Sequence, residues 1–116
     1  MKHLLILLSF LLLSSLLTSC EKNGQGTQRD EDGLTYVGEF KDGEENGQGT
    51  FNHPNGSKYI GEHKADQPNG QGTMTYPNGE KCVGEWVDGG FRNGKCYYKN
   101  GTVQYKYVNG VIYEGS

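Results

Sequence analysis

The sequence lacks an excess of basic residues. Eleven Lys and Arg stand against 14 Asp and Glu, giving a formal net charge of −3 at pH 7, and neither sign forms a long run. Proteins that bind nucleic acids carry clustered positive charge that neutralises phosphates. We therefore expect no nucleic-acid partner.

Aliphatic residues are scarce beyond residue 19. Residues 20–116 hold all 19 glycines and all 8 tyrosines but few Leu, Ile or Val. Such a chain can build only a thin core, so Tyr, Phe and Trp have to supply the burial. Apolar residues there do not recur at the helical spacing of 3.6. This composition predicts a single small, extended, all-β domain.

The long apolar run of the chain lies at its N-terminus. Lys2 and His3 precede residues 4–17, an apolar stretch interrupted only by serines. The run is shorter than the roughly 20 residues that cross a bilayer, and small residues follow it instead of a basic flank. These features favour a signal peptide over a permanent transmembrane helix.

The end of this segment, Leu17-Thr18-Ser19-Cys20, resembles the lipobox of bacterial lipoproteins. The resemblance implies that residues 1–19 are removed and that Cys20 carries a covalent lipid, with no other cofactor. It also implies a membrane-anchored protein of the bacterial cell envelope, on the outer-membrane or periplasmic side and not the cytoplasmic side. The alternative is an ordinary signal peptide followed by a chance cysteine.

Residues 23–110 repeat at a spacing of 23. Tyr36-Val-Gly-Glu-Phe40 recurs as Tyr59-Ile-Gly-Glu-His63 and as Cys82-Val-Gly-Glu-Trp86. The string Asn-Gly-Gln-Gly-Thr occurs at 23–27, 46–50 and 69–73. Two regular units at 36–58 and 59–81 thus follow a half repeat. A third unit is irregular, because Asn93-Gly94 arrives one residue late.

These strings resemble the MORN repeat (membrane occupation and recognition nexus), whose units begin with Tyr-x-Gly-Glu-aromatic and continue through Gly-x-Gly. The resemblance implies a non-enzymatic interaction module. His63, Cys82 and Lys95-Cys96 depart from the pattern and leave the later units open.

The residue pattern itself predicts a single-layer antiparallel β-meander of consecutive hairpins of about 23 residues each. Tyr36, Gly38 and Phe40 share one parity, so a strand there has one aromatic face and one largely polar face. The Asn-Gly pairs at 55–56, 78–79 and 100–101 predict tight type I′ turns. We expect strands near 34–41, 48–53, 57–63, 71–76, 80–87, 94–99, 102–107 and 111–114.

The aromatic face is the candidate ligand or partner surface. Glycines at 38, 61 and 84 leave room for neighbouring rings to lie across each strand. The rings either form the core or line an open trough for a sugar, a peptide or a lipid headgroup. The residues concerned are Tyr36, Phe40, Tyr59, Trp86 and Tyr105.

No catalytic or metal site is expected. Glu39, Glu62 and Glu85 recur two strands apart, about 9.5 Å, too far for one ion to bridge. We interpret them as solvated or bonded to backbone. His53 and His63 have no third ligand at a suitable spacing, and no serine or cysteine has a recognisable histidine partner.

Cys82 and Cys96 are candidates for a disulfide, because export places them in an oxidising compartment. Closing that loop would stabilise the fold by roughly 3 kcal/mol. In a hairpin that turns near 89–91, however, Cys82 would face residue 98 or 99. Free buried thiols are the alternative.

The two ends of the repeat domain, which we place at 34–116, differ. We expect the polar residues 20–33 to form a lipidated tether or half repeat with at most one frayed strand. At the other end, Ile112 and Tyr113 lie in a last strand whose edge could accept a strand from a partner or from a second copy of the chain.

Two functions fit the sequence. One is an interaction or scaffold module that meets the membrane through its lipid and holds an unidentified envelope protein. The other is an envelope glycan- or lipid-headgroup-binding module that uses the aromatic face. A covered face with an unpaired terminal strand would favour the first function, and an exposed cluster of Tyr59, Trp86 and Tyr105 would favour the second.

Overall fold

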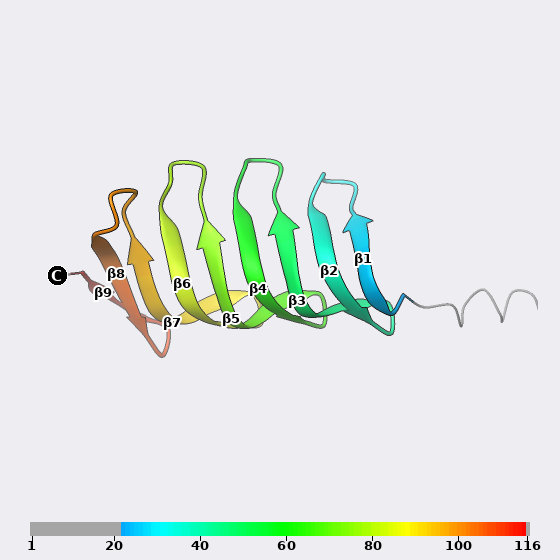
Figure 1. Ribbon diagram of the computed structural model, residues 1–116. Helices are drawn as coiled ribbons and strands as arrows, with labels where there is room; N and C mark the ends of the chain where they lie inside the picture. Colours follow the sequence, from blue (N-terminus) through cyan, green and yellow to red (C-terminus); the bar gives the residue numbers. More distant parts are fainter. Residues whose placement is uncertain (1–21, 116) are drawn as a thin grey trace, which may run out of the picture.

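The structure, a computed structural model, describes residues 22–115. They form one antiparallel sheet in which each strand pairs with the next along the chain (Figure 1). The expected all-β meander is confirmed, and within 22–115 no helix could cross a membrane. The strands are β1 (Gly24–Arg29), β2 (Thr35–Lys41), β3 (Glu44–Asn52), β4 (Lys58–Lys64), β5 (Gln67–Thr75), β6 (Lys81–Val87), β7 (Gly90–Tyr97), β8 (Val103–Val108) and β9 (Val111–Glu114).

The loops that contain the Asn-Gly pairs at 55–56, 78–79 and 100–101 have three residues each. The prediction of type I′ turns there is wrong. Between β3 and β4 the Gly56 N–H donates to the His53 carbonyl at 3.0 Å, and the His53 N–H donates to Ser57 at 2.9 Å. In this loop only Gly56 has a positive φ, 95°. This is a type I turn followed by a glycine bulge. The same bonds recur around Gly79 and Gly101.

Type I′ turns close the opposite ends of the hairpins. Both central residues have positive φ at Asp42-Gly43 (53° and 82°) and at Ala65-Asp66 (50° and 67°). Because these turns contain only two residues, β3 and β5 begin at 44 and 67, well before the starts expected at 48 and 71. Asp88-Gly89 and Asn109-Gly110 have the same conformation.

A bulge in each regular repeat explains why a glutamate recurs at the same position of both repeats. Gly38 pairs with Gly49 but Phe40 pairs with Glu45, so three residues of β3 face Glu39. The Glu39 carboxylate fills the gap in the ladder by accepting the Gln48 N–H at 2.6 Å. Glu62 accepts the Gln71 N–H in the same way, also at 2.6 Å. These glutamates are bonded to backbone and form no acid-base pair.

The half repeat before residue 34 supplies a complete strand. β1 pairs with β2 along its whole length, from Gly24 opposite Phe40 to Arg29 opposite Thr35. The sheet therefore begins at Gly24, and the domain boundary placed at residue 34 does not coincide with an edge of the sheet. The signal peptide expected at 1–19 and the expected lipidation site Cys20 lie outside the described residues.

Candidate functional site

The aromatic side chains form a continuous ladder along one face of the sheet. Successive rings meet largely edge to face, with centroids 4.8 Å apart for Tyr36 and His63, 5.0 Å for His63 and Tyr59, and 5.3 Å for Tyr59 and Trp86. Such pairs contribute about 0.5–1.5 kcal/mol each beyond their buried area. The ladder runs through Phe40, Tyr36, His63, Tyr59, Trp86, Phe91 and Tyr107.

Most of the expected ligand face is core. Tyr36, Phe40, Tyr59 and Trp86 expose between 0% and 5% of their surface. The expectation that they could form an open trough is wrong, because each ring is covered by its neighbours along the ladder. Tyr105 alone of the five is exposed, at 38%. The covered face favours the interaction module over the ligand-binding module.

Glycine makes this burial possible in a single sheet. The Tyr36 ring lies on Gly49, and its hydroxyl donates to the Glu39 carbonyl at 2.7 Å. Tyr59 repeats the arrangement on Gly72 and donates to Glu62 at 2.9 Å. A side chain at either glycine would occupy the space of the ring. The backbone itself thus completes the tyrosine pocket.

The third repeat replaces this arrangement with a disulfide. Cys82 lies opposite Cys96, and their sulfurs are bonded. The prediction that Cys82 would face residue 98 or 99 is wrong. The turn lies at 88–89 and not near 89–91, and the strand register shifts between Glu85 and Trp86. Gly94 lies opposite Gly84, as Gly49 does opposite Gly38, and the Phe91 ring covers it in place of a tyrosine.

Two buried polar side chains within the core were not identified from the sequence. Glu45 and His63 expose 5% and 3% of their surface. Burial, together with the negative charges of Asp66 and Asp30, raises the pKa of Glu45 to about 7. Burial lowers the pKa of His63, so its imidazole is neutral at pH 7 and packs as an aromatic ring. Glu45 shares its repeat position with Phe91, a signal that the 23-residue spacing contained.

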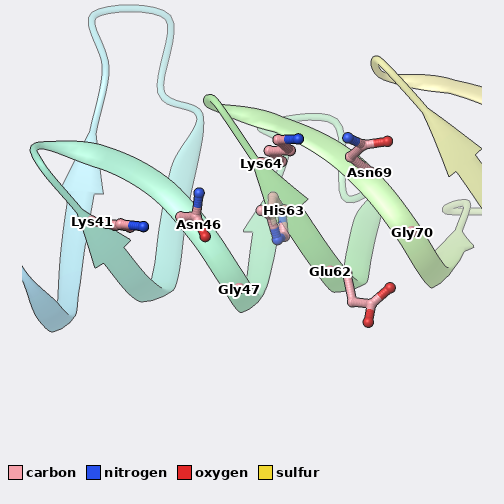
Figure 2. A pocket seen from close by; sticks show the side chains of 8 residues that line it. All are labelled: Lys41, Asn46, Gly47, Glu62, His63, Lys64, Asn69 and Gly70. Carbon is pink, nitrogen blue, oxygen red and sulfur yellow. The ribbon is translucent and has the colours of Figure 1, made fainter.

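A polar hollow of about 500 Å³ lies between the first two regular hairpins. Figure 2 shows its lining side chains, which come from β2, β3, β4 and β5. His63 donates from Nδ1 to the Gly61 carbonyl at 3.0 Å, and its Nε2 makes no hydrogen bond within 22–115. The lining contains no serine, threonine or cysteine and no aromatic ring besides His63, and residues 22–115 hold no cluster suited to a metal. It comprises Lys41, Asn46, Gly47, Glu62, His63, Lys64, Asn69 and Gly70.

The comparison with protein families matches the two regular units. The MORN repeat matches residues 36–58 and 59–81. Residues 36–81 are two MORN repeats. MORN repeats are non-catalytic modules of protein and membrane interaction. No curated protein matches the chain.

The first edge of the sheet is blunted by Lys22. Its Nζ donates to the Thr27 carbonyl of β1 at 2.6 Å and lies 4.6 Å from the centre of the Phe40 ring. The aliphatic part of the side chain lies against Gly26. A lysine along an edge strand opposes pairing with another chain. β1 is therefore a poor acceptor for a partner strand.

The last edge of the sheet is apolar and, within residues 22–115, open. Val111, Ile112 and Tyr113 of β9 expose 54%, 55% and 53% of their surface. Ile112 pairs with Tyr107, which packs on Phe91 and ends the ladder. The expected partner edge thus continues the core of the repeats at the end far from β1 (Figure 1).

Proposed function

We propose that this chain is a non-enzymatic, lipid-anchored MORN-repeat protein that acts as an interaction or scaffold module in a bacterial cell envelope. The MORN repeats support the interaction role. The lipobox-like end of the signal peptide supports an anchor at Cys20. An anchor there would attach the chain to the membrane at the β1 end of the sheet, which is the end opposite β9 (Figure 1).

One observation carries the interaction role. The aromatic rings that could have stacked on a ligand are covered, whereas apolar side chains lie exposed on the last strand. Exposed apolar surface at an unpaired sheet edge is suited to binding a partner strand, with main-chain hydrogen bonds giving affinity. The glycan- or headgroup-binding alternative loses its support, because Tyr59 and Trp86 have no free ring face.

The experiment compares the wild-type protein with Cys20→Ser in the bacterial host. We expect the wild type to sediment with membranes and, after cross-linking in cells, to carry an envelope protein. The Cys20→Ser variant should appear as an uncleaved or unlipidated precursor, or be released. A wild-type protein that leaves the membrane fraction without detergent would refute the anchor.

A second arm separates the two functions. The purified wild type is titrated with envelope glycan and with anionic lipid vesicles while Trp86 fluorescence is recorded. We expect no change in the emission of this buried tryptophan. Saturable quenching by either ligand would instead favour the headgroup- or glycan-binding function.

A further inference from the structure

The two edges of the sheet differ in a way that selects one of them for pairing. β1 carries Lys22 along its backbone, as described above. β9 has no comparable cover within the described residues, and Glu114 is its only charge. Head-to-tail pairing of β9 with β1 would have to displace Lys22 from both Thr27 and Phe40. A filament of that kind is disfavoured.

The hydrogen bonds of β9 define which backbone groups remain free. Asn109-Gly110 is a two-residue turn, and the Gly115 N–H donates to the Gln104 carbonyl at 2.8 Å. Because hydrogen-bonded residues alternate in an antiparallel pair, Val111 and Tyr113 bond to β8. The N–H and C=O groups of Ile112 and Glu114 therefore point to the open edge.

These free groups are complementary to their own copy. We propose that two molecules pair antiparallel through β9, with a two-fold axis at Tyr113. In this register Ile112 bonds to Glu114 of the second copy, and Glu114 bonds to its Ile112. Every free N–H and C=O named above then has a partner, whereas registers centred on Ile112 or on Glu114 leave some without one.

Side chains support the same register. Ile112 lies beside Glu114 of the second copy, so the two carboxylates do not face each other across the axis. The Tyr113 side chains meet on the opposite face of the sheet, where Tyr113 already pairs with Lys106. Ile112 follows Tyr107 at the end of the ladder, and the added strand of the second copy would extend the sheet beyond this end of the core. The result is one continuous sheet of two chains.

The size of the edge sets the strength of the pair. β9 has four residues, and stable interfaces bury upwards of about 1,000 Å². We infer a weak dimer whose formation depends on high local concentration. This part of the inference rests on the proposed lipid anchor, because confinement to a membrane raises the effective concentration of one copy for another.

Cross-linking in native membranes tests the pairing. In the proposed register the Cα atoms of the two Tyr113 residues lie about 4.5 Å apart, within reach of a disulfide. We expect Tyr113→Cys to give a covalent dimer under mild oxidation, at least tenfold more than Thr27→Cys. The control is matched, since Thr27 is an exposed residue in the edge strand β1.

A second substitution shows whether the edge backbone is responsible. Ile112→Pro removes an N–H that β8 does not use, so the β8–β9 hairpin is kept while the partner loses a donor. Added to Tyr113→Cys, it should lower the covalent dimer to the level of Thr27→Cys. Retention of the Cys82–Cys96 disulfide and of Trp86 emission verifies that the variants fold. Ile112→Lys, which places a charge at the edge, should act in the same way.

The outcomes separate self-pairing from the proposed function. Equal cross-linking of Tyr113→Cys and Thr27→Cys, or a yield that proline leaves unchanged, overturns the dimer. If Tyr113→Cys remains monomeric while the wild type still captures an envelope protein, the interaction function stands without self-pairing. Loss of the protein from membranes contradicts the anchor alone, since the Tyr113→Cys to Thr27→Cys ratio is still measured in detergent at high protein concentration.

Discussion

The ring of Tyr59 lies directly on the backbone of Gly72, where an added Cβ would meet the ring Cε2 at 2.5 Å. Tyr36 and Gly49 have the same relationship one repeat earlier. The leading tyrosine and the second glycine of Gly-x-Gly are therefore a packing pair. This pair lets a single layer of strands cover a large aromatic residue.

Gly72→Ala should destabilise the sheet by about 2 kcal/mol, because the methyl group displaces the Tyr59 ring from its position. Urea unfolding followed by Trp86 fluorescence measures the change. The control is Gly90→Ala, where the nearest atom to the new Cβ is the Val87 carbonyl oxygen at 3.6 Å. Equal shifts in the two variants would show that the close packing of Tyr59 on Gly72 is unimportant.

Glu45 should make stability fall as pH rises from about 4.5 to 7. Its pKa is raised to about 7 in the folded state from 4.5, mainly by burial, so the folded protein holds a proton that the unfolded chain releases. That contribution is complete below pH 4.5 and is lost by the time pH passes 7. Glu45→Gln keeps the uncharged form at every pH.

Above pH 7 we expect Glu45→Gln to be more stable than the wild type by about 3 kcal/mol, and near pH 4 to match it. Denaturation at pH 4 and pH 8 gives the two differences. Glu44→Gln, which removes a carboxylate at the exposed neighbouring position, is measured alongside as the control substitution. A constant difference between wild type and Glu45→Gln would contradict the raised pKa.

Loss of the Cys82–Cys96 disulfide should lower the free energy of unfolding by about 3 kcal/mol, from the entropy of the loop it closes. The double variant Cys82→Ser, Cys96→Ser and the wild type are unfolded with and without reductant. Reductant should lower the wild-type midpoint toward that of the double variant and leave the double variant unchanged. If reductant leaves the unfolding midpoint of the wild type unchanged, the Cys82–Cys96 disulfide does not stabilise the fold.

The 23-residue spacing was sufficient to predict the meander, because equivalent tyrosines in successive hairpins share one face. It was not sufficient for the turns. Ala65-Asp66 adopts a type I′ turn without glycine or asparagine, and the Pro54-Asn55-Gly56 loop takes one more residue than a tight turn. For this reason β3 and β5 begin earlier in the structure than the sequence predicted. A residue pattern records turn chemistry less reliably than it records which face is buried.

For the candidate site residues too, the sequence predicted some features and left others undecided. The sequence did not decide whether Tyr36 and Tyr59 are buried, because glycines beside a ring fit both a core and an open trough. The neighbouring rings that cover both tyrosines decide it in the structure. The Cys82–Cys96 register depended on a one-residue shift between Glu85 and Trp86 that leaves no local signal. The exposed edge at Ile112 was predictable, because residues 107–116 contain neither proline nor lysine.

Membrane tethering is the central claim, and the chemical state of Cys20 tests it most directly. The protein is isolated from host membranes in detergent, digested, and its N-terminal peptide is weighed by mass spectrometry. We expect a peptide that begins at Cys20 and carries the mass of a diacylglycerol. An unmodified N-terminus at any other residue would contradict a lipid-anchored MORN protein.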